Sequence, residues 1–166
     1  MKKSLLILGL LAVCGIANAA DNTTMDVTAK VVGSALEVNT TAVNFGEIAR
    51  NATKSQPDTP GRVSISGDAN SRVSVTILNT YNGTADGAVV LSKVADPSDY
   101  RKLTYTPYYT VNGTQITAGE LQHTGITLDG NGSKEINVAG TLQAPRDIEV
   151  GDYSAQMTIK VAYKLH

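Results

Sequence analysis

Alternating hydrophobic and polar positions define the strands that this sequence predicts. The clearest case is the last stretch of the chain, where apolar or aromatic residues occupy every second position from Tyr153 to Leu165. Successive side chains of a strand point to opposite faces of a sheet, so this stretch is predicted to be one long strand with one face in a core. A similar alternation at residues 25–32 predicts a second strand near the N-terminus.

Short alternating segments, separated by Gly, Asn, Asp and Pro, fill the chain between these two stretches. They predict strands at residues 35–38 continuing to 43–48, and at 62–66, 72–78, 88–94, 103–111, 114–117, 125–128 and 134–142, with a polar loop at 51–61. Asn112-Gly113 predicts a two-residue hairpin, because both residues tolerate a positive φ. Pro107 cannot donate to a ladder and is expected at a sheet edge or a bulge. Many short strands without helical periodicity predict an all-β sandwich.

The first 19 residues have the pattern of a secretory signal peptide. Lys2 and Lys3 form a positive region, residues 5–16 an apolar region, and Ala17-Asn18-Ala19 a small-residue cleavage site. The apolar run is too short to span a bilayer. Cys14 lies inside this run, but a valine precedes it where a lipidation motif has a small residue. We therefore expect an exported protein that is cleaved after residue 19.

Cleavage at this site would change both the charge and the redox chemistry of the chain. It would remove the only cysteine and leave 12 of the 14 basic residues beside 15 acidic ones, a net charge of −3. Such a chain is stabilised by burial and hydrogen bonds alone, which one domain of this size can provide. Its weak negative charge gives no electrostatic basis for binding nucleic acid.

Candidate catalytic and metal-binding residues are few. His123 is the only histidine besides His166, and no G-x-S-x-G motif accompanies it. Residues 129–135 offer oxygens at alternate positions, but this stretch lacks the sixth-position Gly and twelfth-position Glu of a calcium loop, and we interpret it as a turn. No set of zinc ligands is present. The sequence therefore predicts neither an enzyme nor a metal or cofactor site.

A cluster of aromatic and basic residues has two interpretations. It could form a receptor-binding patch, or it could supply the core and edge of a sheet, which is the interpretation we favour. The cluster consists of Tyr100, Arg101, Lys102, Tyr105, Tyr108 and Tyr109.

The N-terminal alternating segment also allows two arrangements. Residues 20–32 precede Gly33-Ser34, where the pattern breaks. Folded back, the segment would be one more strand of its own domain. Extended, it could add to the sheet of a neighbouring copy, with backbone bonds giving affinity and alternate side chains filling pockets.

Two short motifs carry a resemblance to a known family. The run Met25-Asp26-Val27-Thr28-Ala29-Lys30-Val31 resembles the N-terminal donor segment of bacterial chaperone–usher pilins, especially those of the colonization-factor type. Gly151 and Tyr163, twelve residues apart, are similar to the Gly that opens the last strand of these pilins and the Tyr near its end. The frame from Asn44-Phe45-Gly46 to Gly151-Asp152-Tyr153-Ser154 also resembles a broad class of secreted bacterial domains.

The resemblance implies a specific organisation and function. Residues 1–19 would be the signal peptide, 20–33 a donor-strand extension, and 34–166 an incomplete immunoglobulin-like β-sandwich that a donated strand completes. The donor side chains would be Met25, Val27, Ala29 and Val31. The acceptor groove, which also pairs with the chaperone, would be formed by Gly151, Met157, Ile159, Val161 and Tyr163.

The implied partners are neighbouring copies of the chain, a periplasmic chaperone, an outer-membrane usher and a host receptor. The protein would pass through the periplasm to the cell surface and form a fimbrium that supports adhesion. The alternative is a self-complete secreted sandwich that acts as a monomeric binding or matrix protein. Deleting residues 21–32 would destabilise that monomer, whereas in a pilin it would stop polymerisation.

Overall fold

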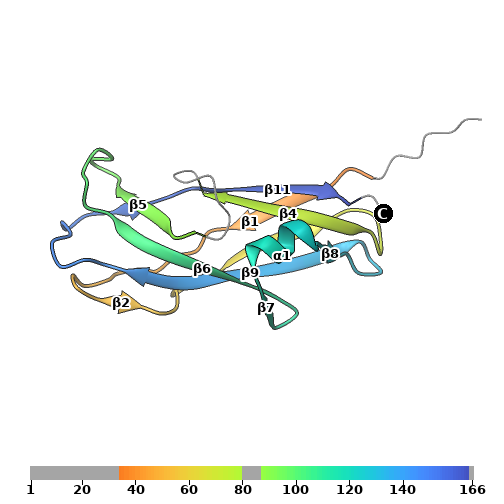
Figure 1. Ribbon diagram of the computed structural model, residues 1–166, viewed down its shortest axis with the longest axis horizontal. Coiled ribbons are helices and arrows are strands. Elements are labelled where there is room, and N and C mark those ends of the chain that lie inside the picture. Colours follow the sequence, from red (N-terminus) through yellow and green to blue (C-terminus); the bar gives the residue numbers. More distant parts are fainter. Residues whose placement is uncertain (1–33, 80–86, 165–166) are drawn as a thin grey trace, which may run out of the picture. The chain divides into compact units, whose positions relative to one another are not determined.

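Two antiparallel sheets form the part of the chain that the computed structural model describes, residues 34–79 and 87–164 (Figure 1). The larger sheet has the order β1-β3-β9-β6-β5-β10, with β2 paired to β9 and β7 to β6, and the smaller has the order β11-β4-β8. The strands are β1 (Glu37–Thr41), β2 (Thr53–Lys54), β3 (Gly61–Ser66), β4 (Arg72–Asn79), β5 (Val89–Lys93), β6 (Leu103–Val111), β7 (Thr114–Ile116), β8 (Ile126–Thr127), β9 (Ser133–Gln143), β10 (Tyr153–Ser154) and β11 (Met157–Tyr163). This architecture confirms the prediction of an all-β sandwich.

The core lies between the inward faces of these sheets. Alternate residues of β3, β4 and β9 supply its most buried part, and Ile65, Val75 and Ile136 have no exposed surface. A second buried group surrounds Phe45 and Tyr105, whose rings meet edge-to-face with centroids 5.4 Å apart. Period-two alternation is what places these side chains on one face, so burial of apolar area and strand formation support each other.

Several sequence predictions are confirmed in detail. β6 has the predicted bounds, and β3, β4, β5 and β9 match their predicted bounds within one residue at each end. Asn112 and Gly113 adopt positive φ values of 51° and 79° between β6 and β7, as the hairpin prediction requires. Pro107 lies in a strand with neighbours on both sides, but β5 pairs with β6 only as far as Tyr105, and the pairing with β7 covers only Tyr109 to Val111. Pro107 therefore pairs with β9 alone, which is the local edge that its missing N–H requires.

Two strand predictions are wrong. The stretch from Tyr153 onward is not one strand, because β10 pairs with β5 in the larger sheet and β11 with β4 in the smaller. The chain passes from one sheet to the other at residues 155–156. The alternation continues across this change, because the inward faces of both sheets contact the same core. Residues 43–48 form no strand and contribute only an isolated bridge between Asn44 and Thr59.

Two short elements were not predicted from the sequence. Helix α1 (Ala118–His123) begins at Thr117, whose side chain accepts from the Glu120 backbone while the Glu120 carboxylate accepts from the Thr117 backbone. This capping box was readable as Thr-x-x-Glu, but six residues are too few to show helical periodicity. Strand β2 lies within the predicted polar loop. No helix among the described residues is long and apolar enough to cross a membrane.

Candidate functional site

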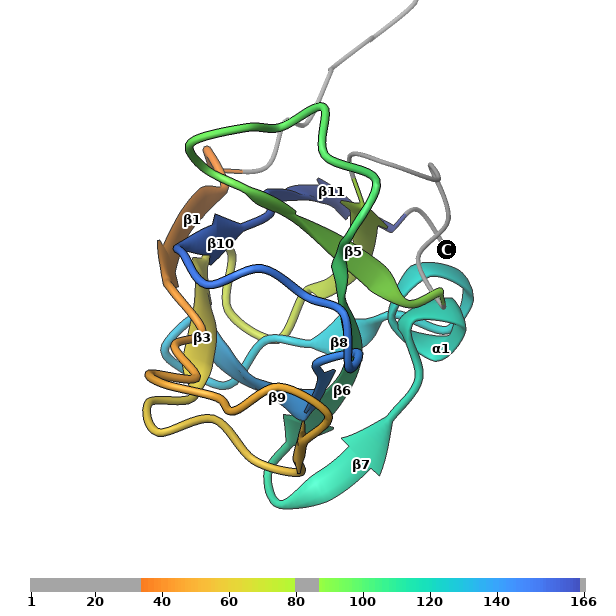
Figure 2. The same ribbon diagram turned by 90° about the vertical axis from the view of Figure 1, so that its left-hand side faces the viewer.

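Strands β1 and β11 each lie at the end of a sheet. β1 pairs on one side with β3, and β11 pairs on one side with β4. Within residues 34–79 and 87–164, the opposite edge of each strand has no ladder partner. Both strands border the same side of the sandwich (Figure 2). Unpaired edges of this kind can accept another strand, because their backbone N–H and C=O groups remain available.

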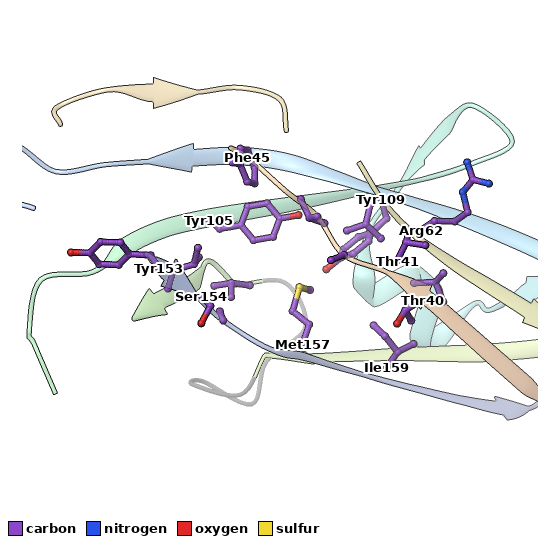
Figure 3. Close-up of a pocket in the computed structure, with 17 residues that line it drawn as sticks. Thr40, Thr41, Phe45, Arg62, Tyr105, Tyr109, Tyr153, Ser154, Met157 and Ile159 are labelled. Atoms are coloured by element: carbon purple, nitrogen blue, oxygen red, sulfur yellow. The ribbon is translucent and has the colours of Figure 1, made fainter. Parts of the chain in front are cut away.

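A cavity of about 560 Å³ lies between these two edges. Figure 3 shows the side chains of Met157 and Ile159 on β11 and of Thr40 and Thr41 on β1 around it, with Tyr105 facing the same space. Its complete lining is Thr40, Thr41, Ala42, Val43, Phe45, Arg62, Val63, Val89, Leu91, Tyr105, Tyr109, Val138, Tyr153, Ser154, Ala155, Met157 and Ile159. The lining is therefore largely apolar, and it is drawn from both sheets.

The core is incompletely covered along β11. Its inward side chains pack against the buried core but are only half-buried: Met157, Ile159, Val161 and Tyr163. On β4, directly alongside, the inward side chains of Val73, Val75 and Ile77 have no exposed surface. Leu36, just before β1, and Val38, within β1, are also half-buried against the same core. We call the surface between β1 and β11 the groove.

A hydrogen-bonded contact lies beside the Tyr163 end of β11. The Tyr163 hydroxyl accepts from the Asp68 backbone N–H at 2.7 Å. A Cβ at Gly67 would lie 2.5 Å from that hydroxyl oxygen and 2.7 Å from Leu36, so only glycine allows this approach. The Asp68 carboxylate accepts from the Ser34 N–H at 3.0 Å, and hydrogen bonds from Ser34 lower the pKa of Asp68. The start of the described chain is thus fixed beside the end of β11.

The structure brings together four of the five acceptor residues named from the sequence. Met157 and Ile159 line the cavity, whereas Val161 and Tyr163 continue the same inward face beyond it. Gly151 lies apart, exposed in the loop before β10 rather than in the strand that it was expected to open. The predicted donor residues lie outside the described part of the chain.

Sequence reasoning missed the opposite wall of the groove. Residues 40–43 contribute that wall, although only Ala42 and Val43 are apolar there. No spacing rule connects this segment with β11, since the two are more than 100 residues apart and belong to different sheets. Only the three-dimensional arrangement reveals their proximity.

The tyrosine cluster divides between the core and the surface. Tyr105 and Tyr109 are buried, as the favoured interpretation predicted, and burial raises the pKa of Tyr105. Tyr100, by contrast, is 81 % exposed, with the Arg101 guanidinium 5.4 Å from its ring centroid. The cluster is therefore not a single surface.

An ionic network joins two loops near Tyr100. The Glu149 carboxylate accepts from the Lys93 ammonium at 2.5 Å and also from Arg101, whose guanidinium contacts Asp99 at 3.0 Å. Hydrogen bonds from Lys93 and then Arg101 lower the pKa of Glu149, and hydrogen bonds from Arg101 lower that of Asp99. These partners extend the range in which both carboxylates are ionised to more acidic pH.

The residues considered for catalysis or metal binding have structural contacts. His123 lies in the last turn of α1, and its carbonyl accepts from the Lys164 ammonium. The Asp129 carboxylate accepts from the N–H groups of Asn131 and Ser133, both at 2.9 Å, which is the geometry of a turn. The described residues contain no group of three or more His, Cys, Asp or Glu side chains that could hold a metal ion.

No protein-family model matches this chain, and no curated protein matches its sequence. Among solved structures, it is similar to a chain of a chaperone–tip adhesin complex of CFA/I fimbriae, with 14% identity and a TM-score of 0.46. That match covers 77% of this chain and 42% of the other, so this chain spans less than half of that protein's length. It is also similar to the P pilus rod subunit PapA, with 13% identity, a TM-score of 0.41, and coverage of 85% and 100%. Since both TM-scores lie below 0.5, neither similarity alone establishes a family for this chain.

Proposed function

We propose that this chain is a structural subunit of a surface pilus and that its groove accepts an extended strand from another copy. The observation that carries the proposal is the cavity between the unpaired edges of β1 and β11, lined by half-buried apolar side chains. A strand placed there would pair with the free edge of β11 and cover Met157 and Ile159. This is β-strand addition, in which backbone bonds give affinity and side-chain pockets give register.

The donor in this proposal is the segment 20–33 of the neighbouring copy. Its inward side chains would be Met25, Val27, Ala29 and Val31, whose period of two matches the spacing of inward residues along β11. Burial of Met25, Val27 and Val31 contributes about 1.5–3 kcal/mol each, and the smaller Ala29 adds about 0.8 kcal/mol, which gives roughly 5–10 kcal/mol before ordering costs. Together with the backbone ladder bonds, this burial would supply the affinity in a polymer whose subunits share no disulfide.

A subunit with such a groove would require assembly partners. An open groove exposes apolar core and an unpaired sheet edge, both of which favour aggregation. A periplasmic chaperone would cover the groove during export, and an outer-membrane usher would exchange the chaperone for the next donor strand. The assembled fimbrium on the cell surface would support adhesion to a host receptor. The subunit itself would have no enzymatic role.

A matched pair of groove variants tests this proposal. Ile159 points into the groove and Thr158, its neighbour on β11, points outward and is exposed. Ile159→Lys places a charge where the donor strand would pack, so we expect loss of the polymer, whereas Thr158→Lys should leave the polymer intact. The measurement is an SDS gel of material sheared from the producing cells, run with and without boiling.

The proposal predicts a ladder of multimers that collapses on boiling for the unmodified chain and for Thr158→Lys. Deleting residues 21–32 should abolish the ladder while leaving a folded subunit in complex with its chaperone. A single monomer band in boiled and unboiled lanes, together with soluble protein that unfolds when residues 21–32 are deleted, would instead support the self-complete sandwich.

A further inference from the structure

Exposed hydrophobic side chains gather at one end of the sandwich. Among the described residues, the exposed large hydrophobic ones are Val94 (56 % exposed), Tyr100 (81 %) and Val150 (81 %). Val94 and Tyr100 belong to the loop between β5 and β6, and Val150 belongs to the loop between β9 and β10. Figure 2 looks onto this end of the sandwich, where the two loops lie. We call Val94, Tyr100 and Val150 the end patch.

The two loops that carry the end patch are tied together. The Val94 N–H donates to the Asp152 carbonyl at 2.8 Å. Glu149, next to Val150, accepts from Lys93 and Arg101, which flank Val94 and Tyr100. The end patch is therefore held in place before any partner binds, which lowers the entropic cost of binding.

The end patch also adjoins the groove. A second cavity, of about 920 Å³, is lined by residues 149–153, including Val150. It shares Val43, Phe45, Leu91 and Tyr153 with the cavity between β1 and β11. The apolar surface thus continues from the groove, past β10, to the end patch.

We propose that the end patch contacts a second copy of this chain, at the surface around Ser34 where that copy's described residues begin. The proposal rests on the proposed function and follows from the direction of the added strand. Every ladder in the described residues is antiparallel. A strand that continues this pattern beside β11 runs from the Tyr163 end to the Met157 end and leaves the groove beside β10.

Chain length then fixes which part of the neighbour meets the end patch. The donor segment's last inward residue is Val31, and only residues 32 and 33 separate it from Ser34. Three residues of extended chain span at most about 10 Å. The neighbour's Ser34 must therefore lie close to the groove exit, where the end patch is exposed.

The contacts of Ser34 define the neighbour's side of this interface. The Ser34 N–H donates to the Asp68 carboxylate. The N–H of Gly67, which precedes Asp68, donates to the Gly132 carbonyl at 2.8 Å. The turn that contains Asn131 therefore lies beside the first described residues, which include exposed Ala35 and half-buried Leu36. The end patch would pack against this surface.

Site-specific photo-crosslinking in assembled polymer tests the inference. A benzophenone amino acid replaces Val150, and, as a matched control, Lys160, which is exposed on the outward face of β11. We expect the Val150 probe to give covalent dimers whose cross-linked peptides contain residues 34–36, 67–71 or 129–133 of another copy. The Lys160 probe should not give these peptides. In a second measurement, the double variant Tyr100→Ser with Val150→Ser should still polymerise but dissociate roughly tenfold faster in SDS.

The outcomes separate this inference from the proposed function. Three results would overturn the contact while a boiling-sensitive ladder still supports strand donation. They are the absence of these cross-links, cross-links only to a different protein, and an unchanged dissociation rate of the double variant. Absence of a ladder from the unmodified chain would overturn both. Cross-links to the named peptides together with faster dissociation would support the contact.

Discussion

Replacing Ile159 by alanine should cost more stability when the groove is filled than when it is empty. Ile159 is half-buried on the inward face of β11, whereas Ile77 on the adjacent β4 has no exposed surface and pairs with it directly. Ile159 is thus a core residue that is half-exposed while the groove is empty, whereas Ile77 is fully buried whether or not the groove is filled.

The expected magnitudes follow from this difference in burial. Truncating a fully buried Ile to Ala costs about 2–5 kcal/mol, which applies to Ile77→Ala in either state of the groove. At the half-buried Ile159, the same truncation should cost only about 1–2 kcal/mol in the open domain, because part of the side chain already contacts water. A donor strand that covers Ile159 should raise this cost by at least about 1 kcal/mol.

Urea unfolding of two chains measures this difference. One chain contains residues 34–166, and the other carries residues 21–33 appended after His166 through a short Gly-Ser linker. A donor antiparallel to β11 begins at the Tyr163 end, so the linker has little distance to span. An equal cost of Ile159→Ala in both chains would refute the reasoning, and Thr158→Ala, which changes an exposed side chain, serves as the neutral control.

Three further predictions concern stability and use the same unfolding assay. Gly132→Ala should destabilise the domain by about 2 kcal/mol or more, because Gly132 has a φ of +74° and a Cβ there would lie 2.1 Å from the Gly67 carbonyl oxygen. Gly130→Ala in the same turn is the control, since a Cβ there meets nothing within 4 Å. Equal effects of the two substitutions would contradict this prediction. Thr117→Ala should cost about 1 kcal/mol through loss of the capping box, and an unchanged urea midpoint would show that α1 does not depend on its cap. The pKa values of Asp99 and Glu149 lie below their ordinary 3.8 and 4.5, so the stability that these groups contribute is present above those values and is lost as pH falls through the folded pKa values. The unmodified chain should therefore lose stability between pH 6 and about pH 3, and Arg101→Gln should make this loss smaller. Arg146→Gln, which changes an exposed side chain, is the control and should leave the loss unchanged. Identical acid profiles for the two variants would contradict this prediction.

The strands of the sandwich were predictable where a single physical signal decides them. β6 is bounded by its own alternation and by the turn at Asn112-Gly113, so its limits follow from local chemistry. β3 and β4 likewise present one apolar face to the core. In these segments, local preference and tertiary burial agree.

Other features depend on contacts that sequence spacing does not encode. The change of sheet at residues 155–156 leaves the alternation of Met157 and Ile159 unaltered, so the pattern is equally consistent with one strand or two. The inward face of β11 was predictable for the same reason, but its partner wall at residues 40–43 was not. The exposure of Tyr100, beside the buried Tyr105, depends on where one loop leaves the sheet.

The most direct test of strand donation is a disulfide trap between the donor segment and the groove. Cys14 is the only cysteine and lies within the expected signal peptide, so introduced cysteines have no competitor. Ala29→Cys is combined in turn with Met157→Cys, Ile159→Cys and Val161→Cys, because inward residues of adjacent strands place their Cβ atoms about 4.5–5.5 Å apart, near the range that a disulfide needs. Strand donation predicts that at least one pair gives a ladder that survives boiling and collapses with a thiol reductant. An intramolecular disulfide in a monomer, with no ladder for any pair, would contradict it.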